Sequence, residues 1–326
     1  MNRNILKQKK ATALNEKNKE IADFFRTNAP IAVLTRKQSS LNFRKLTTLG
    51  FLKGFFSPTE FFALLLPMQF SLKRKYLSRQ WEFLDKEARL ELKEYLTDSG
   101  DFDLFGNSFT GPNYAALLEL IREVVLSDQY HAKQSIKKDS IVVDAGANIG
   151  VFSVFAATLA SEGLVFAFEP TASTFSFLKK NTEKYQNVTC FEVGLGETRA
   201  ERNILNKGAG SGDNVMQDSP FLNHSKYHNG IFEKTEITTI DFFVSEKKIP
   251  RVDFIKIDTE GYEAKILAGA KETIKKFKPV IAMSAYHNAT DKDDLPRIVK
   301  DISPDYVCEL FNECEEDFIC YVPSDK

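Results

Sequence analysis

The stretch Ile141-Val142-Val143-Asp144-Ala145-Gly146-Ala147-Asn148-Ile149-Gly150 decides the fold that this chain is expected to adopt. Its first three residues are apolar, as in a short strand buried on both faces of a parallel sheet. A loop with two glycines follows, and the sequence predicts an apolar helix over residues 151–160. Strand, glycine loop and helix in this order are typical of an open α/β sheet, in which ligands bind beyond the carboxyl ends of the strands.

The same alternation continues toward the C-terminus. Short apolar runs predict strands at 164–168, 188–193, 252–257 and 279–284, and helical spacing predicts helices at 172–184, 240–246 and 263–277. This order implies right-handed crossovers and a mostly parallel sheet covered on both faces. Residues 306–310 and 317–322 are expected to close the chain as an antiparallel strand pair. The predicted fold class is therefore α/β.

Charge divides the chain into two parts. The 326 residues carry 44 Lys and Arg and 45 Asp and Glu, a net charge of -1. Residues 1–80 hold 16 basic and 4 acidic side chains, a balance of +12, so the remaining 246 residues hold 28 and 41, a balance of -13. The basic part could meet an anionic membrane, an anionic substrate or the acidic part of its own chain.

Residues 1–112 are predicted to form a basic, largely helical N-terminal region, and residues 113–326 a second domain. Helices are expected near 13–26, over 78–98 and over 114–126, with a break between parts at 100–113. The apolar block 49–72 is followed by a basic cluster at 73–75. This block is read either as a buried helical pair or, with residues 49–79, as a surface that docks on a membrane.

The composition is that of a soluble globular protein, with 43% hydrophobic and 27% charged residues. The most apolar stretch, 51–70, is interrupted by Lys53, Pro58, Glu60 and Pro67, so it falls short of a membrane span. No signal peptide is recognised, and a cytoplasmic location, with peripheral membrane association as the alternative, is expected. The four cysteines are expected to be free thiols, with Cys308 and Cys320 as packing residues in the last two strands.

Unusual residues stand at the expected strand ends. Glu169 lies 19 residues after Gly150 and ends the second strand, where a carboxylate can accept hydrogen bonds from a ribose. The nicotinamide pattern G-x-G-x-x-G fails, because Asn148 and Val151 stand where its second and third glycines belong. The loop therefore suits a ribose-bearing ligand without a pyrophosphate, of which S-adenosylmethionine is one. The alternative is a tight turn that binds nothing.

With these motifs the chain resembles the FkbM-type methyltransferases over about residues 142–306. The resemblance implies a Rossmann-like methyltransferase fold and S-adenosylmethionine-dependent O-methylation of a hydroxyl on a sugar, glycan or secondary metabolite. The stretches that carry it are Val143–Gly150, Phe168-Glu169-Pro170, Val193-Gly194-Leu195-Gly196, Thr239-Ile240-Asp241, Val252–Gly261, Ile266–Ala270, Tyr286-His287 and Asp294-Leu295-Pro296.

The resemblance also implies roles for single residues. Those expected to bind the cofactor are Asp144, Gly146, Asn148 and Gly150 at the methionine end, Glu169 at the ribose, and Gly194 and Leu195 beside the adenine. For the proton we expect Asp258 and His287, because both follow neighbouring strands and a histidine with a pKa near the working pH suits a general base. Glu260 is counted with them as a catalytic residue, and Asp258 could orient His287, hold the acceptor hydroxyl or ligate a divalent cation together with Glu260, although no metal site is predicted. Asp258 as a turn residue and His287 as a core histidine are the alternatives.

Other features are weaker. His224 and His228 have the spacing of metal ligands but a loop composition, residues 208–212 suggest a mobile loop over the acceptor, and residues 197–236 are expected to supply acceptor loops. The expected partner is a small-molecule or glycan acceptor. Two other functions compete with this one: a scaffold that binds cofactor without transfer, and a methyltransferase that meets nucleic acid through the basic region, for which no RNA-binding motif is found.

Overall fold

The computed structural model describes residues 35–36, 100–104, 107–111, 120–208, 214–219, 222, 230–312 and 315–323. The chain divides into two compact units, Met1–Ala115 and Ala116–Lys326. In the first unit, β1 (Thr35–Arg36), β2 (Gly100–Leu104) and β3 (Asn107–Gly111) form an antiparallel sheet. Residues 100–113, which are predicted to be a break between the two parts of the chain, thus contain the antiparallel strands β2 and β3. The helices expected at 13–26 and 78–98 and the apolar block 49–72 lie outside the described residues.

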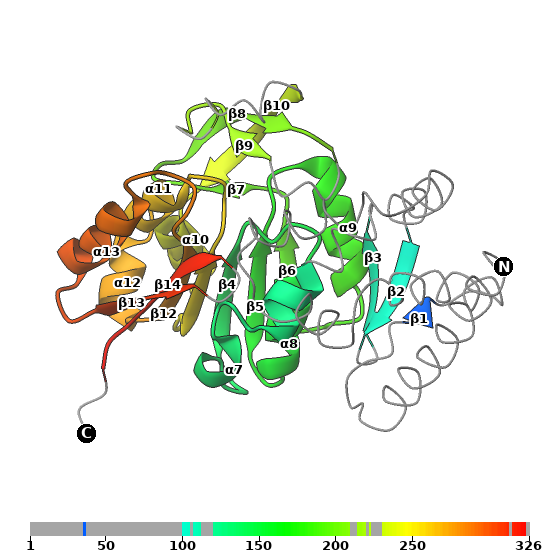
Figure 1. Cartoon of the computed structure of the whole chain (residues 1–326), viewed down its shortest axis with the longest axis horizontal. Coiled ribbons are helices and arrows are strands. Elements are labelled where there is room, and N and C mark those ends of the chain that lie inside the picture. The colour runs from blue at the N-terminus through cyan, green and yellow to red at the C-terminus, as the bar shows by residue number, and fades with distance from the viewer. Residues whose placement is uncertain are drawn as a thin grey trace, which may run out of the picture. The chain divides into compact units, whose positions relative to one another are not determined.

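A seven-stranded sheet forms the centre of the second unit (Figure 1). In space its strands follow the order β13-β14-β12-β11-β4-β5-β6. Their bounds are β4 Ile141–Ala145, β5 Leu164–Phe168, β6 Val188–Phe191, β11 Phe254–Ile257, β12 Val280–Ser284, β13 Val307–Asn312 and β14 Glu316–Tyr321. The pairs from β12 through β6 are parallel, and β14 runs antiparallel to both β12 and β13. The predicted parallel sheet with an antiparallel C-terminal pair is confirmed.

Strand order reverses between β4 and β11. From β4 the chain builds outward through β5 and β6, and then returns to lay β11 and β12 on the other side of β4. In an open α/β sheet such a reversal leaves a crevice beyond the carboxyl ends of the two central strands. The glycine loop follows β4, and Asp258 follows β11, so both lie at this crevice.

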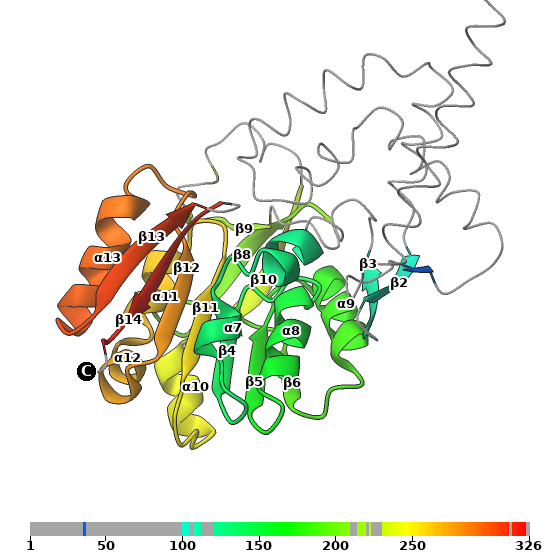
Figure 2. The same ribbon diagram turned by 60° about the horizontal axis from the view of Figure 1, so that its bottom comes forward.

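Helices cover both faces of the sheet (Figure 2). On β4, the side chains of Ile141, Val143 and Ala145 join one core that also contains apolar residues of the later helices. On the other face, Phe254 of β11 stacks on Phe152, with ring centroids 6.0 Å apart. The later helices are α10 Ile240–Glu246, α11 Glu263–Ala268, α12 Lys271–Phe277 and α13 Asp291–Ile302, and the earlier ones are η1 Ile121–Leu126, α7 Ala132–Ser135, α8 Val151–Leu159 and α9 Ala172–Thr182.

The single helix expected over 263–277 is two helices. α11 ends before Gly269, and α12 begins at Lys271. A Cβ at Gly269 would overlap the carbonyl oxygen of Gly196, so the glycine lets this corner pack directly on the backbone after β7. Helical spacing predicts helix over this range, but it could not reveal the long-range contact that divides it.

A second, four-stranded sheet has the order β7-β10-β8-β9. It contains β7 Gly194–Leu195, β8 Ala200–Asn206, β9 Val215–Met216 and β10 Ile231–Thr238. The stretch 197–236 was expected to supply loops, and this is wrong for β8, β9 and most of β10. Both long strands alternate exposed and buried residues over much of their length, and apart from Ile231 and Phe232 their exposed positions are polar and resemble loop sequence.

Cys308 and Cys320 form a disulfide, so the prediction of free thiols is wrong for this pair. The two residues are directly opposed in the antiparallel register of β13 and β14, with Cα atoms 4.0 Å apart. Cys190 is free. The described helices include none that is long and apolar enough to span a membrane.

We expect reduction of the disulfide to lower the free energy of unfolding by about 3 kcal/mol, because the bond closes a short loop and limits the unfolded chain. Urea unfolding with and without reductant measures this difference. The variant Cys190→Ala should respond to reductant as the unchanged protein does. An identical unfolding midpoint in both conditions would show that the bond contributes nothing.

Candidate active site

The loop after β4 has a strained backbone that only certain residues tolerate. Gly146, Asn148 and Gly150 have φ values of +75°, +50° and +92°. Glycine adopts this region freely, and asparagine does so more readily than most side chains. A Cβ at Gly146 would also overlap the carbonyl oxygen of Asp258. The loop after β4 and the segment after β11 therefore touch through their backbones.

A buried ammonium group lies beneath this loop. Lys256 of β11 is 4% exposed, and its Nζ lies 3.2 Å from Oδ1 of Asp144 and donates to the carbonyl oxygen of Gly146 over 2.6 Å. Oδ2 of Asp144 accepts a 2.6 Å hydrogen bond from Ser153. Asp144 is fully buried: its Oδ2 has this hydrogen bond, and its Oδ1 has the ion pair with Lys256 but no hydrogen-bond partner among the described residues. Direct contact between Asp144 and a ligand therefore stays a prediction, and its contacts here hold the loop.

Glu169 joins the loop to the end of β5. Its carboxylate accepts the backbone N–H of Asn148 over 3.1 Å, the backbone N–H of Thr171 over 3.0 Å and the Thr171 hydroxyl. Burial raises the pKa of Glu169, and these hydrogen bonds oppose that rise. Since a carboxylate offers about four acceptor positions, one remains for a ligand hydroxyl.

Asn148 supplies a buried acceptor of the kind a ligand would satisfy. Its Oδ1 is buried and has no hydrogen-bond partner among the described residues. Such a group is costly unless a donor reaches it, and an ammonium or a hydroxyl of a ligand could do so. Gly194 and Leu195 lie in β7, where a Cβ at Gly194 would stand 2.6 Å from Cδ1 of Ile237. Their position beside an adenine stays a prediction.

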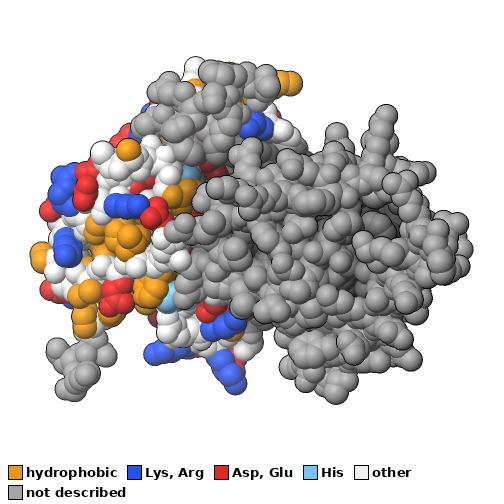
Figure 3. Space-filling model, in the orientation of Figure 1, with side chains coloured by type: hydrophobic (Ala, Val, Ile, Leu, Met, Phe, Trp, Pro, Cys, Tyr) orange, Lys and Arg blue, Asp and Glu red, His pale blue; other side chains and the backbone are white. Residues whose placement is uncertain are grey.

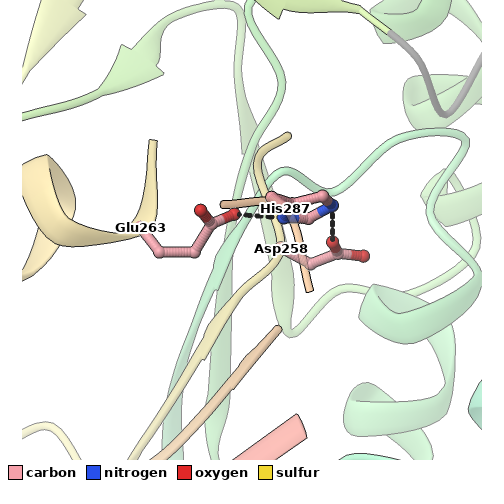
Figure 4. A group of neighbouring side chains, drawn as sticks. All are labelled: Asp258, Glu263 and His287. Carbon is pink, nitrogen blue, oxygen red and sulfur yellow. Dashed lines mark hydrogen bonds and ion pairs between the residues drawn. The ribbon is translucent and has the colours of Figure 1, made fainter. Parts of the chain in front are cut away.

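Three ionisable side chains meet at the ends of β11 and β12. These strands are parallel neighbours, and as expected Asp258 and His287 follow their carboxyl ends together. Nε2 of His287 lies 3.9 Å from Oδ1 of Asp258, and its Nδ1 lies 3.0 Å from Oε1 of Glu263 (Figure 4). Glu260 is also close, with Oε1 3.8 Å from the same Nε2. Glu260 adopts a φ of +53°.

The charges around His287 change its chemistry. Burial disfavours its charged form, but the charge and hydrogen bond of Glu263, with the charges of Glu260 and Asp258, outweigh burial and raise the pKa to about 10. The expectation of a pKa near neutrality is therefore wrong. These charges therefore favour the imidazolium form of the ring, which has no lone pair with which to accept a proton.

Asp258 remains ionised in the same surroundings. Burial acts to raise its pKa, yet the charges of Lys256 and His287 and a hydrogen bond from Tyr130 lower it. The Tyr130 hydroxyl donates to Oδ2 over 2.9 Å. The side chain of Asp258 is 28% exposed, whereas that of His287 is fully buried. Asp258 is thus the more accessible of the two to an acceptor.

The sequence alone did not identify Tyr130, Lys256 or Glu263 as part of this site. A lone lysine within the apolar strand β11 was a signal, because a lysine is almost never fully buried unless it is paired. Nothing comparable pointed to Tyr130, which is 128 residues from Asp258 along the chain. The sequence predicts Glu263 only as the first residue of a helix.

Asp258, Glu263 and His287 also have the chemistry of metal ligands, with ligand atoms within 4.8 Å of one another. The two carboxylates, however, approach opposite nitrogens of the ring. An ion bound to one nitrogen would therefore contact one of them and not both. His224, His228 and residues 209–213 lie outside the described residues.

The fold is that of a Rossmann-like methyltransferase. A model of the methyltransferase FkbM domain matches residues 144–315, which is more than half of the chain. The chain belongs to the FkbM methyltransferase family.

Individual relatives are distant. The chain is 25% identical over 189 residues to the hexuronic acid methyltransferase AglP of Haloferax volcanii, covering 57% of this chain and 72% of that protein. It is 26% identical over 149 residues to the 2-O-methyltransferase NoeI of Sinorhizobium fredii, covering 43% and 61%. The crystal structure of methyltransferase FkbM from Methylobacillus flagellatus aligns with a TM-score of 0.44 and 22% identity, over 64% of this chain and 53% of that one.

We expect Lys256→Met to destabilise the protein by about 3–5 kcal/mol, because it leaves the buried charge of Asp144 without its partner. The double variant Lys256→Met/Asp144→Asn should recover much of that loss, since the asparagine can still accept from Ser153. A double-mutant cycle in urea measures the coupling. A coupling near zero would mean that the ion pair does not hold the loop.

Proposed function

We propose that this chain uses S-adenosylmethionine to methylate a hydroxyl group on a sugar, glycan or other secondary metabolite. The observation that carries the proposal is Glu169, whose carboxylate binds the amide of Asn148 and so unites the glycine loop with the end of β5. The names of AglP and NoeI describe methylation of a sugar acid and at a 2-oxygen, which supports a hydroxyl acceptor. We assign the reaction to residues 113–326.

In this proposal the cofactor lies across the carboxyl ends of β4 and β5. Gly146, Asn148 and Gly150 line its methionine end, and the unpaired Oδ1 of Asn148 accepts a hydrogen bond from its ammonium group. Glu169 accepts a ribose hydroxyl at its remaining acceptor position. Gly194 and Leu195 flank the adenine. Asp144 supports the loop from below through Lys256 and Ser153.

Bound S-adenosylmethionine would supply a sulfonium methyl group for in-line transfer to the acceptor oxygen. The chain has to hold that oxygen in line and receive its proton. Asp258 does this best, because its carboxylate is ionised, partly exposed and fixed by Tyr130. Glu260 and His287 complete the charged group around it.

The rival function of a cofactor-binding scaffold predicts binding without transfer. Methylation of nucleic acid would call for a basic surface. In Figure 3, acidic, basic and apolar side chains are interspersed on the described part of the surface, and no continuous basic face is visible among them. Nucleic acid was expected to bind through the basic N-terminal region, and residues 1–80 lie almost entirely outside the described residues.

Calorimetric titration with S-adenosylmethionine tests the cofactor. We expect saturable binding that weakens at least about tenfold in Glu169→Gln, because a hydrogen bond to a charged group contributes about 1.5–3 kcal/mol. Glu162→Gln changes an exposed acid two residues before β5, and this variant should bind as the unchanged protein does. Absence of binding by the folded protein would overturn the proposal.

We expect Asp258→Asn to retain cofactor affinity while turnover falls about 100-fold or more, because the variant cannot receive the acceptor proton. Release of S-adenosylhomocysteine with a panel of neutral and uronic acid glycosides measures turnover. The exposed Asp293→Asn serves as the control. Binding without turnover on any acceptor would favour the scaffold, and normal turnover by Asp258→Asn would remove Asp258 from the mechanism.

A further inference from the structure

Both ring nitrogens of His287 face carboxylates. Nδ1 lies 3.0 Å from Oε1 of Glu263. Nε2 lies 3.8 Å from Oε1 of Glu260 and 3.9 Å from Oδ1 of Asp258. Because an ionised carboxylate can only accept hydrogen bonds, Nδ1 must carry a proton, and the negative charges near Nε2 favour a proton there as well.

Glu263 is fixed independently of the ring. It is the first residue of α11 and is 1% exposed. Its Oε1 also accepts the backbone N–H groups of Thr259, over 2.9 Å, and Gly261, over 3.3 Å. One carboxylate therefore holds both the turn after Asp258 and the imidazole of His287. The ring cannot turn Nδ1 toward an acceptor molecule without losing this contact.

We propose that Glu263 is a positioning residue that keeps His287 doubly protonated, so that His287 acts as a fixed cation beside Asp258 and not as a general base. This inference rests on the proposed function. Within it, the carboxylate of Asp258, and not the ring of His287, receives the proton of the acceptor hydroxyl. The cation stabilises the ionised form of Asp258, in agreement with the lowered pKa of that carboxyl.

Among the described residues, the charged groups that interact with His287 are acidic. Glu263 belongs to α11, and Asp258 and Glu260 follow β11. Asp291 at the start of α13 and Asp317 of β14 also interact with the ring, although burial raises the pKa of both carboxyls, and that of Asp317 well above its usual value. Lys256, the nearest basic group, lies beside Asp258. A nearby positive charge would favour the neutral ring. Among the described neighbours, the acids outweigh any such effect and favour the cation.

The first test uses the cofactor-free protein, so it does not depend on methyl transfer. The chain has only four histidines, and His287→Ala would identify the signals of this one in a nitrogen-15 NMR titration. We expect both ring nitrogens of His287 to be protonated at pH 7.5. A neutral ring at that pH would overturn the inference, even if S-adenosylmethionine binds normally. Absence of cofactor binding with a protonated ring would instead defeat only the proposed function.

The second test is Glu263→Gln, which keeps the shape and one acceptor oxygen but removes the charge. Loss of an adjacent charge should lower the pKa of His287 by about two units, so that most rings are neutral at pH 9 and protonated at pH 7. If turnover needs the cation beside Asp258, turnover at pH 9 relative to pH 7 should fall about tenfold. The unchanged protein should show a change of less than about twofold, since the pKa of its His287 is about 10. Glu272→Gln, an exposed acid of α12, should behave in the same way as the unchanged protein.

Two results would contradict the proposal. If His287 were a base, Glu263→Gln would raise turnover at pH 7, because a larger share of the rings would be neutral. If Glu263 were only structural, the variant would lose the same fraction of turnover at every pH. In Glu263→Gln and in Glu272→Gln, titration of the His287 nitrogens reports the protonation state of the ring directly. This measurement distinguishes the two outcomes.

Discussion

The ammonium group of Lys256 is the interaction on which the site depends. It bridges the two halves of the sheet at the point where strand order reverses, by pairing with Asp144 of β4 and donating to the carbonyl oxygen of Gly146. A buried charge is tolerated only when such partners surround it. The same ammonium lowers the pKa of Asp258, which lies two residues further along the chain. One side chain thus shapes both the ligand loop and the acidic group opposite it.

Much of the fold follows from local patterns. The apolar runs predict the central strands, because a strand that is buried on both faces has a nearly continuous apolar sequence. The loop from Gly146 to Gly150 and the position of Glu169 are also local signals. The strands β8 and β10 were missed because one side of each is exposed, and their polar residues resemble a loop. The disulfide could be inferred only from the register that brings Cys308 opposite Cys320.

The residue types of the site were predictable, but their protonation was not. A histidine after β12 and an aspartate after β11 were identified from strand ends alone. The pKa of His287 depends on how many carboxylates surround it, and Glu263 reaches it from a helix 24 residues away in the chain. Tyr130 fixes Asp258 from a still more distant segment. These pKa shifts depend on which residues of distant elements pack together, and the spacing of residues within one element does not reveal that.

The contact between Gly146 and the carbonyl oxygen of Asp258 has a consequence for anyone who wishes to redesign this protein. The backbone to which we assign the cofactor and the backbone that carries Asp258 are in direct contact, with no space between them. Libraries that vary residues 259–261 to change acceptor preference would therefore disturb cofactor affinity as well. The four-stranded sheet of β7 to β10 meets the α11–α12 corner through Gly196 and Gly269, and its exposed side offers variation with fewer such penalties.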